Sequence, residues 1–130
     1  MKKRVVLFCM GILLGITYLA AQNVPDGMLA AFKKGNAGAL KGFLNDQVEL
    51  TIQSHSQPLD KHKAETRLAD FFAAYKVQDF RINHQGKRNE TGFIVGTLIT
   101  SNGEFRVNCF FKKAGEKYVI HQIRIDKSNE

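Results

Sequence analysis

The chain has 130 residues, of which 19 are Lys or Arg and 12 are Asp or Glu, giving a formal net charge of +7. This length fits one domain with a single modest core. Three basic residues lie among the first four positions, and the remaining excess is too mild to indicate a nucleic-acid-binding protein.

The N-terminus predicts export. Three basic residues at positions 2–4 precede an apolar run over residues 5–18, and small residues follow it. The run is shorter than the roughly 20 apolar residues of a membrane-spanning helix. We therefore expect a cleaved signal peptide over residues 1–21, one domain over residues 22–130, and a periplasmic or secreted protein without a stable membrane anchor. Losing three of the 19 basic residues, against 12 acidic ones, leaves a net charge of +4.

Cysteine use argues against an intramolecular disulfide. The sequence has two cysteines, and Cys9 lies inside the expected signal peptide, so Cys109 would stand alone in the exported protein. A nucleophile and an intermolecular bridge are the functional alternatives for Cys109. Its position between Val107 and Phe111 favours a small buried hydrophobic side chain.

Helix signals come first along the expected domain. Pro25 and Asp26 open a helix that ends at Gly35. Asn36 can cap a second, short helix, and the alternating pattern of residues 48–52 predicts a strand.

The third helix has the clearest pattern. Asp60 is its expected N-cap. Its apolar side chains recur on a period of 3.6 residues, which is typical of a helix that lies on a sheet. These side chains are Ala64, Leu68, Phe71, Phe72 and Tyr75. Because helix signals precede strand signals, the sequence predicts an α+β fold with N-terminal helices packed on an antiparallel sheet.

Four strands are expected after the helices, over residues 77–84, 91–100, 104–112 and 117–126. Asn102-Gly103 is typical of a two-residue type I′ turn between the second and third of them. That turn would pair Ser101 with Glu104 and place the alternate apolar residues of both strands on one face.

The loop between the last two expected strands sets which side chains face the third helix, and so predicts a pocket. A three-residue loop over residues 113–115 would place His121 opposite Val107, on the apolar face that covers the third helix. His84 has the parity of the same face, and Tyr75 lies at the end of the helix. The expected site is a small apolar pocket between the third helix and the sheet, with Tyr75, His84 and His121 as candidates. The alternative is that these histidines are part of the core, with their ring nitrogens hydrogen-bonded there, and bind no ligand.

The opposite face of the sheet mixes apolar and charged side chains. Aromatic and arginine residues beside aliphatic ones are typical of partner interfaces, and a solvated face needs fewer apolar side chains. The interface candidates are Phe93, Val95, Arg106, Phe110, Tyr118 and Arg124. A homodimer or partner surface and a plain solvated face both stay open.

Catalytic and metal-binding motifs are absent from the sequence. It has no serine-nucleophile motif, phosphate-binding glycine loop or motif of paired carboxylates. His84, Cys109 and His121 do not follow a metal-ligand spacing. Asp79 should point away from the pocket, which weakens a histidine–carboxylate dyad. No catalytic residue, cofactor or metal is therefore expected.

The order of the elements resembles the nuclear transport factor 2-like (cystatin-like, cone-shaped) superfamily over nearly all of residues 22–130. Several short sequence words look like an exported bacterial family within it, domain-of-unknown-function family 4783. These words are Asp70-Phe71-Phe72, His84-Gln85-Gly86, Gly96-Thr97-Leu98, Gly103-Glu104-Phe105-Arg106-Val107 and Ile123-Arg124-Ile125. The resemblance implies a curved sheet and a pocket. The superfamily also includes isomerases and dehydratases, but this chain lacks the acidic residues that the isomerases place in the cone.

These patterns lead to one main functional expectation with two alternatives. The main expectation is an exported, non-catalytic binding or interaction module that takes a small apolar ligand. The first alternative is an isomerase- or dehydratase-like enzyme that uses a pocket histidine. The second is a homodimeric interaction protein that uses the outer sheet face.

Overall fold

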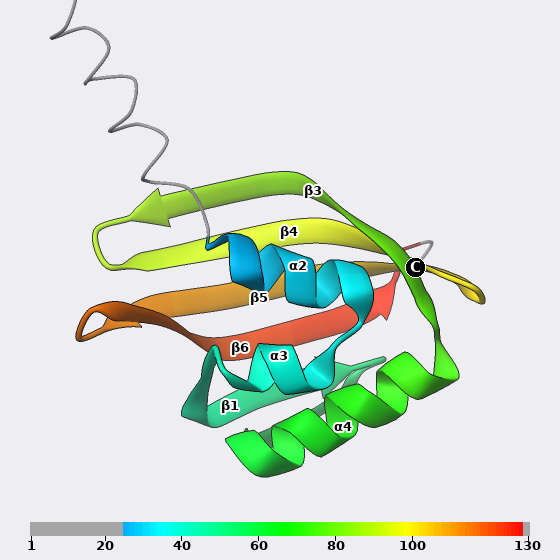
Figure 1. The fold of residues 1–130 in the computed structure, drawn as a ribbon, viewed down its shortest axis with the longest axis horizontal. Helices are drawn as coiled ribbons and strands as arrows, with labels where there is room; N and C mark the ends of the chain where they lie inside the picture. Colours follow the sequence, from blue (N-terminus) through cyan, green and yellow to red (C-terminus); the bar gives the residue numbers. More distant parts are fainter. Residues whose placement is uncertain (1–24, 129–130) are drawn as a thin grey trace, which may run out of the picture.

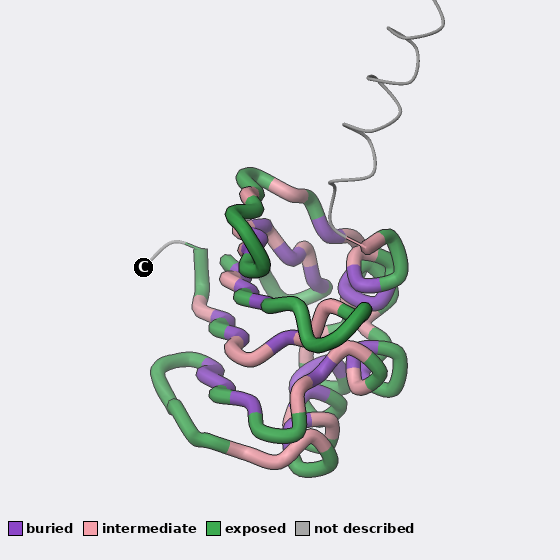
Figure 2. Tube along the Cα trace, turned by 90° about the vertical axis from the view of Figure 1, so that its left-hand side faces the viewer, coloured by how far each residue is buried: buried purple, intermediate pink, exposed green. Residues whose placement is uncertain are grey.

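The computed structural model describes residues 25–128, so the expected signal peptide lies outside the described residues. Within them, three helices lie on one side of a six-stranded sheet (Figure 1). Viewed from the side, the helices and the sheet form two layers (Figure 2). The expected α+β architecture is therefore confirmed. We call the sheet face that is turned away from the helices the outer face.

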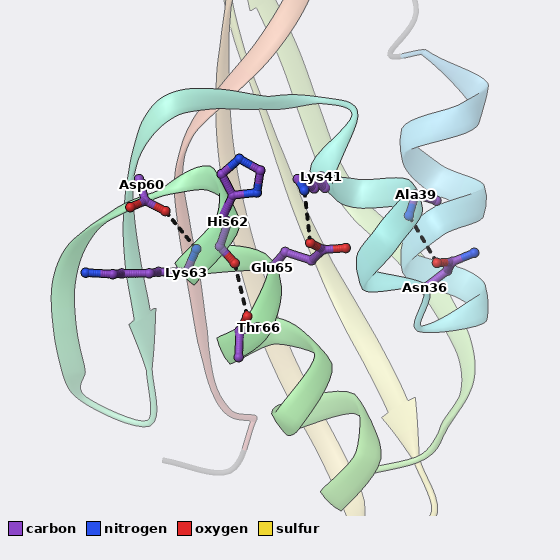
Figure 3. Close-up of polar contacts among 8 residues, drawn as sticks. All are labelled: Asn36, Ala39, Lys41, Asp60, His62, Lys63, Glu65 and Thr66. Atoms are coloured by element: carbon purple, nitrogen blue, oxygen red, sulfur yellow. Dashed lines mark hydrogen bonds and ion pairs between the residues drawn. The ribbon is translucent and has the colours of Figure 1, made fainter.

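The first two helices begin where the sequence predicts, and the first also ends at the predicted residue. Helix α2 spans Asp26–Lys34 and ends at Gly35, whose φ of 61° is left-handed. Helix α3 spans Ala37–Lys41. The side chain of Asn36 caps α3 by accepting a hydrogen bond from the amide of Ala39 at 3.0 Å (Figure 3).

Helix α4 spans Lys61–Ala74 and is the longest of the three. Its expected N-cap is confirmed, because Asp60 accepts a hydrogen bond from the amide of Lys63 at 2.8 Å (Figure 3). An ion pair of 3.3 Å between Lys41 and Glu65 joins α3 to α4. The predicted apolar stripe faces the core, with Ala64, Leu68, Phe71 and Phe72 buried.

The strands of the described chain form one sheet in the order β2-β1-β6-β5-β4-β3. The strands β1 and β6 are parallel, and the other neighbours are antiparallel. Strand β2 was not predicted, and it forms a hairpin with β1 through Gln53 and Ser54, which both have positive φ. The bounds are β1 Leu44–Ile52, β2 His55–Asp60, β3 Val77–Arg88, β4 Thr91–Thr100, β5 Gly103–Ala114 and β6 Lys117–Lys127.

The hairpin between β4 and β5 turns one residue earlier than predicted. Thr100 pairs with Gly103, so Ser101 and Asn102 form the loop. The hydroxyl of Thr100 accepts from the amide of Asn102 at 3.1 Å and donates to the carbonyl of Gly103 at 2.7 Å, which stabilises this turn. Asn102 lacks the positive φ that a type I′ turn requires. The predicted pairs are therefore wrong, but a shift of two positions keeps every side chain on its predicted face.

The hairpin between β5 and β6 also differs from the prediction. Gly115, with φ of 68°, and Glu116 form a two-residue loop in place of the three-residue loop. Together with a bulge further along β6, this loop pairs Val107 with Ile125, and the predicted pairing of Val107 with His121 is wrong.

A β-bulge interrupts the pairing of β5 with β6. Phe111 pairs with Ile120, whereas its neighbour Phe110 pairs with Gln122. His121 is therefore an extra residue without a partner position on β5. The bulge also reverses the parity of β6 before it, so Ile120 is buried in the core, although its neighbour His121 was the residue expected on the apolar face.

Strand β3 has two more bulges, where Gln78 and Asn83 are the extra residues. Phe80, which lies between the two bulges, is buried in the core. Because Asn83 is extra, His84 pairs with Val95 of the outer face. His84 is exposed, and the prediction that it lies on the apolar face that covers the third helix is wrong.

The core lies between the helices and the inner face of the sheet. The rings of Phe32 on α2 and Phe80 on β3 stack at 5.0 Å between centroids. Phe71 on α4 meets Phe105 on β5 edge to face at 5.1 Å. Cys109 is fully buried among these apolar side chains, which confirms the packing interpretation of this cysteine.

Candidate functional site

A hollow of about 430 Å³ lies where the β3–β4 hairpin meets β5 and β6. This volume is within the usual range of small-molecule sites. The hollow is lined by Gly86, Lys87, Arg88, Thr91, Gly92, Phe93, Phe110, Phe111 and His121. Four strands contribute to the wall, so the sheet itself holds the site in place.

Two aromatic rings form the apolar wall. Phe93 on β4 and Phe110 on β5 are cross-strand partners on the outer face. The ring of Phe93 also lies close over β3, because a Cβ placed on Gly86 would come within 2.6 Å of it. Phe110 is 37% exposed and is the one exposed large hydrophobic side chain of residues 25–128. The wall therefore offers aromatic surface to solvent.

His121 stands beside these rings because of its bulge. Its Nδ1 atom is buried and has no hydrogen-bond partner within the described chain. Burial lowers the pKa of His121 below its ordinary value, and the nearby Lys112 ammonium lowers this pKa further. The imidazole is therefore neutral at neutral pH, and it adds an uncharged polar group to a mainly apolar wall.

Cationic side chains edge the aromatic wall. Arg88 and Thr91 pair across β3 and β4, and Thr91 pairs in turn with Lys112 of β5. These three residues form the row of the outer face next to Phe93 and Phe110, by the alternation of strand residues. Neither Arg88 nor Lys112 was predicted to belong to the site. Lys112 lies two positions after Phe110, which was the available signal for it. Arg88 is brought beside Phe93 only by the pairing of β3 with β4, which has no local sequence signal.

The ammonium of Lys87 lies elsewhere, although Lys87 lines the hollow. Its Nζ atom lies 4.3 Å from the ring centroid of Tyr118. Lys87 pairs with Gly92, in the row that faces the core. On the outer face, Arg88 therefore lines the hollow, and Lys112 lies beside it in the same row, near His121.

The structure does not bring the three predicted pocket residues together. Tyr75 packs against Phe105, with ring centroids 4.8 Å apart, at the other end of the sheet. His84 lies on the outer face with its ring 5.4 Å from that of Phe93. His84 and His121 thus flank the same aromatic wall, whereas Tyr75 belongs to a different region.

The interface candidates divide between the two faces. Five lie on the outer face by register: Phe93, Val95, Arg106, Phe110 and Arg124. Tyr118 instead meets the buried Phe111 edge to face at 5.6 Å, so it is not part of this surface. The bulge at His121 explains the difference, because it reverses the parity of the residues before it.

Comparison with known proteins assigns the family. Residues 25–126 match the family model of DUF4783, a domain of unknown function. The chain belongs to the DUF4783 family. Crystal structures of DUF4783 proteins from Bacteroides uniformis and Bacteroides ovatus are 56% and 50% identical to it, with TM-scores of 0.79 and 0.80. They cover 83% and 84% of this chain and 100% and 99% of their own. A search of curated proteins found no match.

More distant structures confirm the fold of this DUF4783 domain as nuclear transport factor 2-like or cystatin-like. A protein whose name contains NTF2 is 14% identical, with a TM-score of 0.64, and covers 82% of this chain and 96% of its own. A cystatin-like domain from Nostoc punctiforme is 9% identical, with a TM-score of 0.61, and covers 78% and 71%.

The space between α4 and the sheet of this DUF4783 domain is filled by its own side chains. Leu68 of α4 and Phe105 of β5 are completely buried, and the ring of Phe71, also on α4, packs against Phe105. The aromatic wall of the hollow, Phe93 and Phe110, lies on the outer face, which is turned away from α4.

The two histidines that flank the aromatic wall of this DUF4783 domain have no carboxylate partner in the described chain. Neither His84 nor His121 makes a hydrogen bond or ion pair with a carboxylate among residues 25–128. In the same range, no group of three His, Cys, Asp or Glu side chains is arranged to hold a metal ion.

No helix of residues 25–128 is long and apolar enough to cross a membrane.

Proposed function

We propose that this DUF4783 domain is an exported, non-catalytic binding module that holds a small ligand in the hollow of the outer face. The exposed ring of Phe110, beside Phe93 and above a hollow of about 430 Å³, carries the proposal. A ligand with a flat apolar part would cover this surface and remove it from water, which favours binding.

The packing of the core supports an outer position for the ligand. Leu68 and Phe105 are completely buried, and the rings of Phe71 and Phe105 meet 5.1 Å apart between α4 and the sheet. A ligand placed there would have to displace core side chains, and displacing well-packed side chains carries a large energetic penalty. The outer hollow needs no such rearrangement.

Export is part of the proposal because of the N-terminal sequence. Its basic start, apolar run and small residues are the pattern of a signal peptide. Recovery of the mature protein outside the cytoplasm, beginning at Gln22, tests this part by N-terminal sequencing. A chain that keeps residues 1–21 in the cell would contradict it.

Binding is tested with a soluble aromatic probe, naphthalene-2-sulfonate, added to the exported protein. We expect NMR signals of Phe93, Phe110 and His121 to shift together. The Phe110→Ser variant should weaken binding about tenfold or more, since it removes most of the exposed aromatic surface. The matched control is Ile99→Ser, which changes the same face outside the hollow. Shifts confined to α4, or no shift at all, would overturn the proposal.

A homodimer is the second candidate function. The exposure of Phe110 and the half-buried Phe93, Val95 and Ile99 favour a second copy on the outer face. Sedimentation equilibrium compares the wild type with Phe110→Glu. A wild-type dimer that the variant converts into a monomer would support this candidate, and a wild-type monomer at high concentration would remove it.

A further inference from the structure

We infer that the ligand of the hollow is a small anion with a flat aromatic body, an inference that rests on the proposed function. The rings of Phe93 and Phe110 form a flat apolar wall, which favours a ligand with a flat aromatic body. The next row of the outer face has Arg88 at one side and Lys112 at the other, which favours a ligand that also carries a negative charge. The ligand would lie across the strands with its anionic group toward this row.

The register places the two cations on one line. Arg88 of β3, Thr91 of β4 and Lys112 of β5 occupy successive positions across the sheet. Neighbouring strands lie about 4.8 Å apart, so the two cationic side chains start from backbones roughly 10 Å apart, with Thr91 between them. Long side chains can converge on one anionic group from this separation. Arginine also suits planar anions because it can donate two parallel hydrogen bonds.

Arg88 and Lys112 have no ion-pair partner among the described residues. The ion pairs of residues 25–128 join Lys41 to Glu65, Lys61 to Asp46 and Arg124 to Asp126. None of them involves Arg88 or Lys112.

The surroundings of the hollow are basic as well. Lys87, Lys113 and Lys117 lie on the same hairpin ends, where Glu90 and Glu116 are the acidic residues of the two turns. With Arg88 and Lys112, these ends carry five basic residues against two acidic ones. A concentration of one sign around a cleft raises the local concentration of the opposite charge.

The neutral His121 fits the same ligand. It lines the hollow beside the aromatic wall, and the Lys112 ammonium helps to keep its pKa low. An anionic group bound beside Lys112 would oppose this effect and raise the pKa of His121. The imidazole therefore reports whether the anion is present, separately from any contact with the rings.

The test compares probes that share one body and differ in charge. Naphthalene-2-sulfonate and 2-naphthoate are the anions, and 2-naphthol is neutral at pH 7. We expect both anions to bind about tenfold more tightly than 2-naphthol, since a hydrogen bond to a charged group contributes more than a neutral one. Raising the salt concentration should weaken the anions and leave 2-naphthol unchanged. The His121 pKa, followed by NMR, should rise with the anions only.

Variants assign the charge effect to the row. Arg88→Gln and Lys112→Gln should each reduce the affinity for the two anions about three- to tenfold and leave that for 2-naphthol unchanged. Lys63→Gln, an exposed base on α4, is the control and should change neither affinity. Binding of all three probes in the hollow with equal affinity would overturn this inference and leave the proposed function standing. Failure of all three to bind there would overturn both.

Discussion

Phe93 and Phe110 lie directly opposite each other on β4 and β5, with both rings on the outer face of the sheet. Cross-strand aromatic pairs stabilise a sheet modestly, yet this pair leaves Phe110 37% exposed. The bulge at His121 begins immediately beside it on β6. The pair and the bulge together make one end of a regular sheet into a hollow with apolar, polar and cationic sides.

The first prediction concerns close packing at Gly96. A Cβ at this position would lie 2.5 Å from the Phe80 ring and 2.7 Å from the carbonyl oxygen of Arg81. Gly96→Ala should therefore lower the free energy of unfolding by about 1–3 kcal/mol, as overpacked cores do. Urea unfolding measures the change. Gly38→Ala, whose nearest contact of 3.4 Å is an ordinary one, is the control, and equal stability of Gly96→Ala and wild type would contradict the described packing.

The second prediction concerns the pH dependence of stability. Burial lowers the pKa of His121 in the folded chain from its ordinary 6.5, so the unfolded chain binds the proton more tightly. The contribution of His121 is complete above about pH 6.5 and is lost as the pH falls below it. His121→Gln should therefore lose less stability than wild type between pH 7 and pH 5. The exposed His84→Gln is the control, and identical pH profiles for wild type and His121→Gln would disprove the effect.

The third prediction concerns Cys109. Complete burial raises the pKa of its thiol, and the thiolate is the reactive form. In a Cys9→Ser background, a disulfide reagent at pH 8 should label Cys109 only as fast as the native protein opens. Adding denaturant should complete the reaction. Rapid labelling of the native protein would contradict the packing of β5 against the helices.

The fourth prediction concerns the start of α4. Asp60 accepts a hydrogen bond from the amide of Lys63, which also lowers the Asp60 pKa. Asp60→Ala should lower the melting temperature, because the helix loses its cap. Asp60→Asn should stay close to wild type, since asparagine is an equally good cap. A melting temperature for Asn as low as that for Ala would show that the charge, and not the cap, is what matters.

The sequence contained enough information for the helices and for most strand faces. Caps at Asn36 and Asp60 and the left-handed Gly35 act through local chemistry, so each could be located from a few residues. The β4–β5 pairing was wrong by two positions, because Thr100 stabilises a different turn. The faces survived because side chains alternate with a period of two.

The candidate site was harder to predict because bulges decide it. The extra residues Asn83 and His121 have no distinctive sequence pattern, and each reverses the parity of its strand. His84 therefore lies on the outer face and not on the predicted apolar face, and His121 does not lie opposite Val107 as predicted. The alternation rule assumes regular strands, and it fails at these two positions.

The position of a bound probe tests the central claim most directly. We would measure intermolecular NOEs between naphthalene-2-sulfonate and the protein at saturating probe. The proposal predicts NOEs from the naphthalene protons to the rings of Phe93 and Phe110 and to the imidazole of His121. NOEs to Leu68 and Phe71 of α4, without any to Phe110, would contradict it.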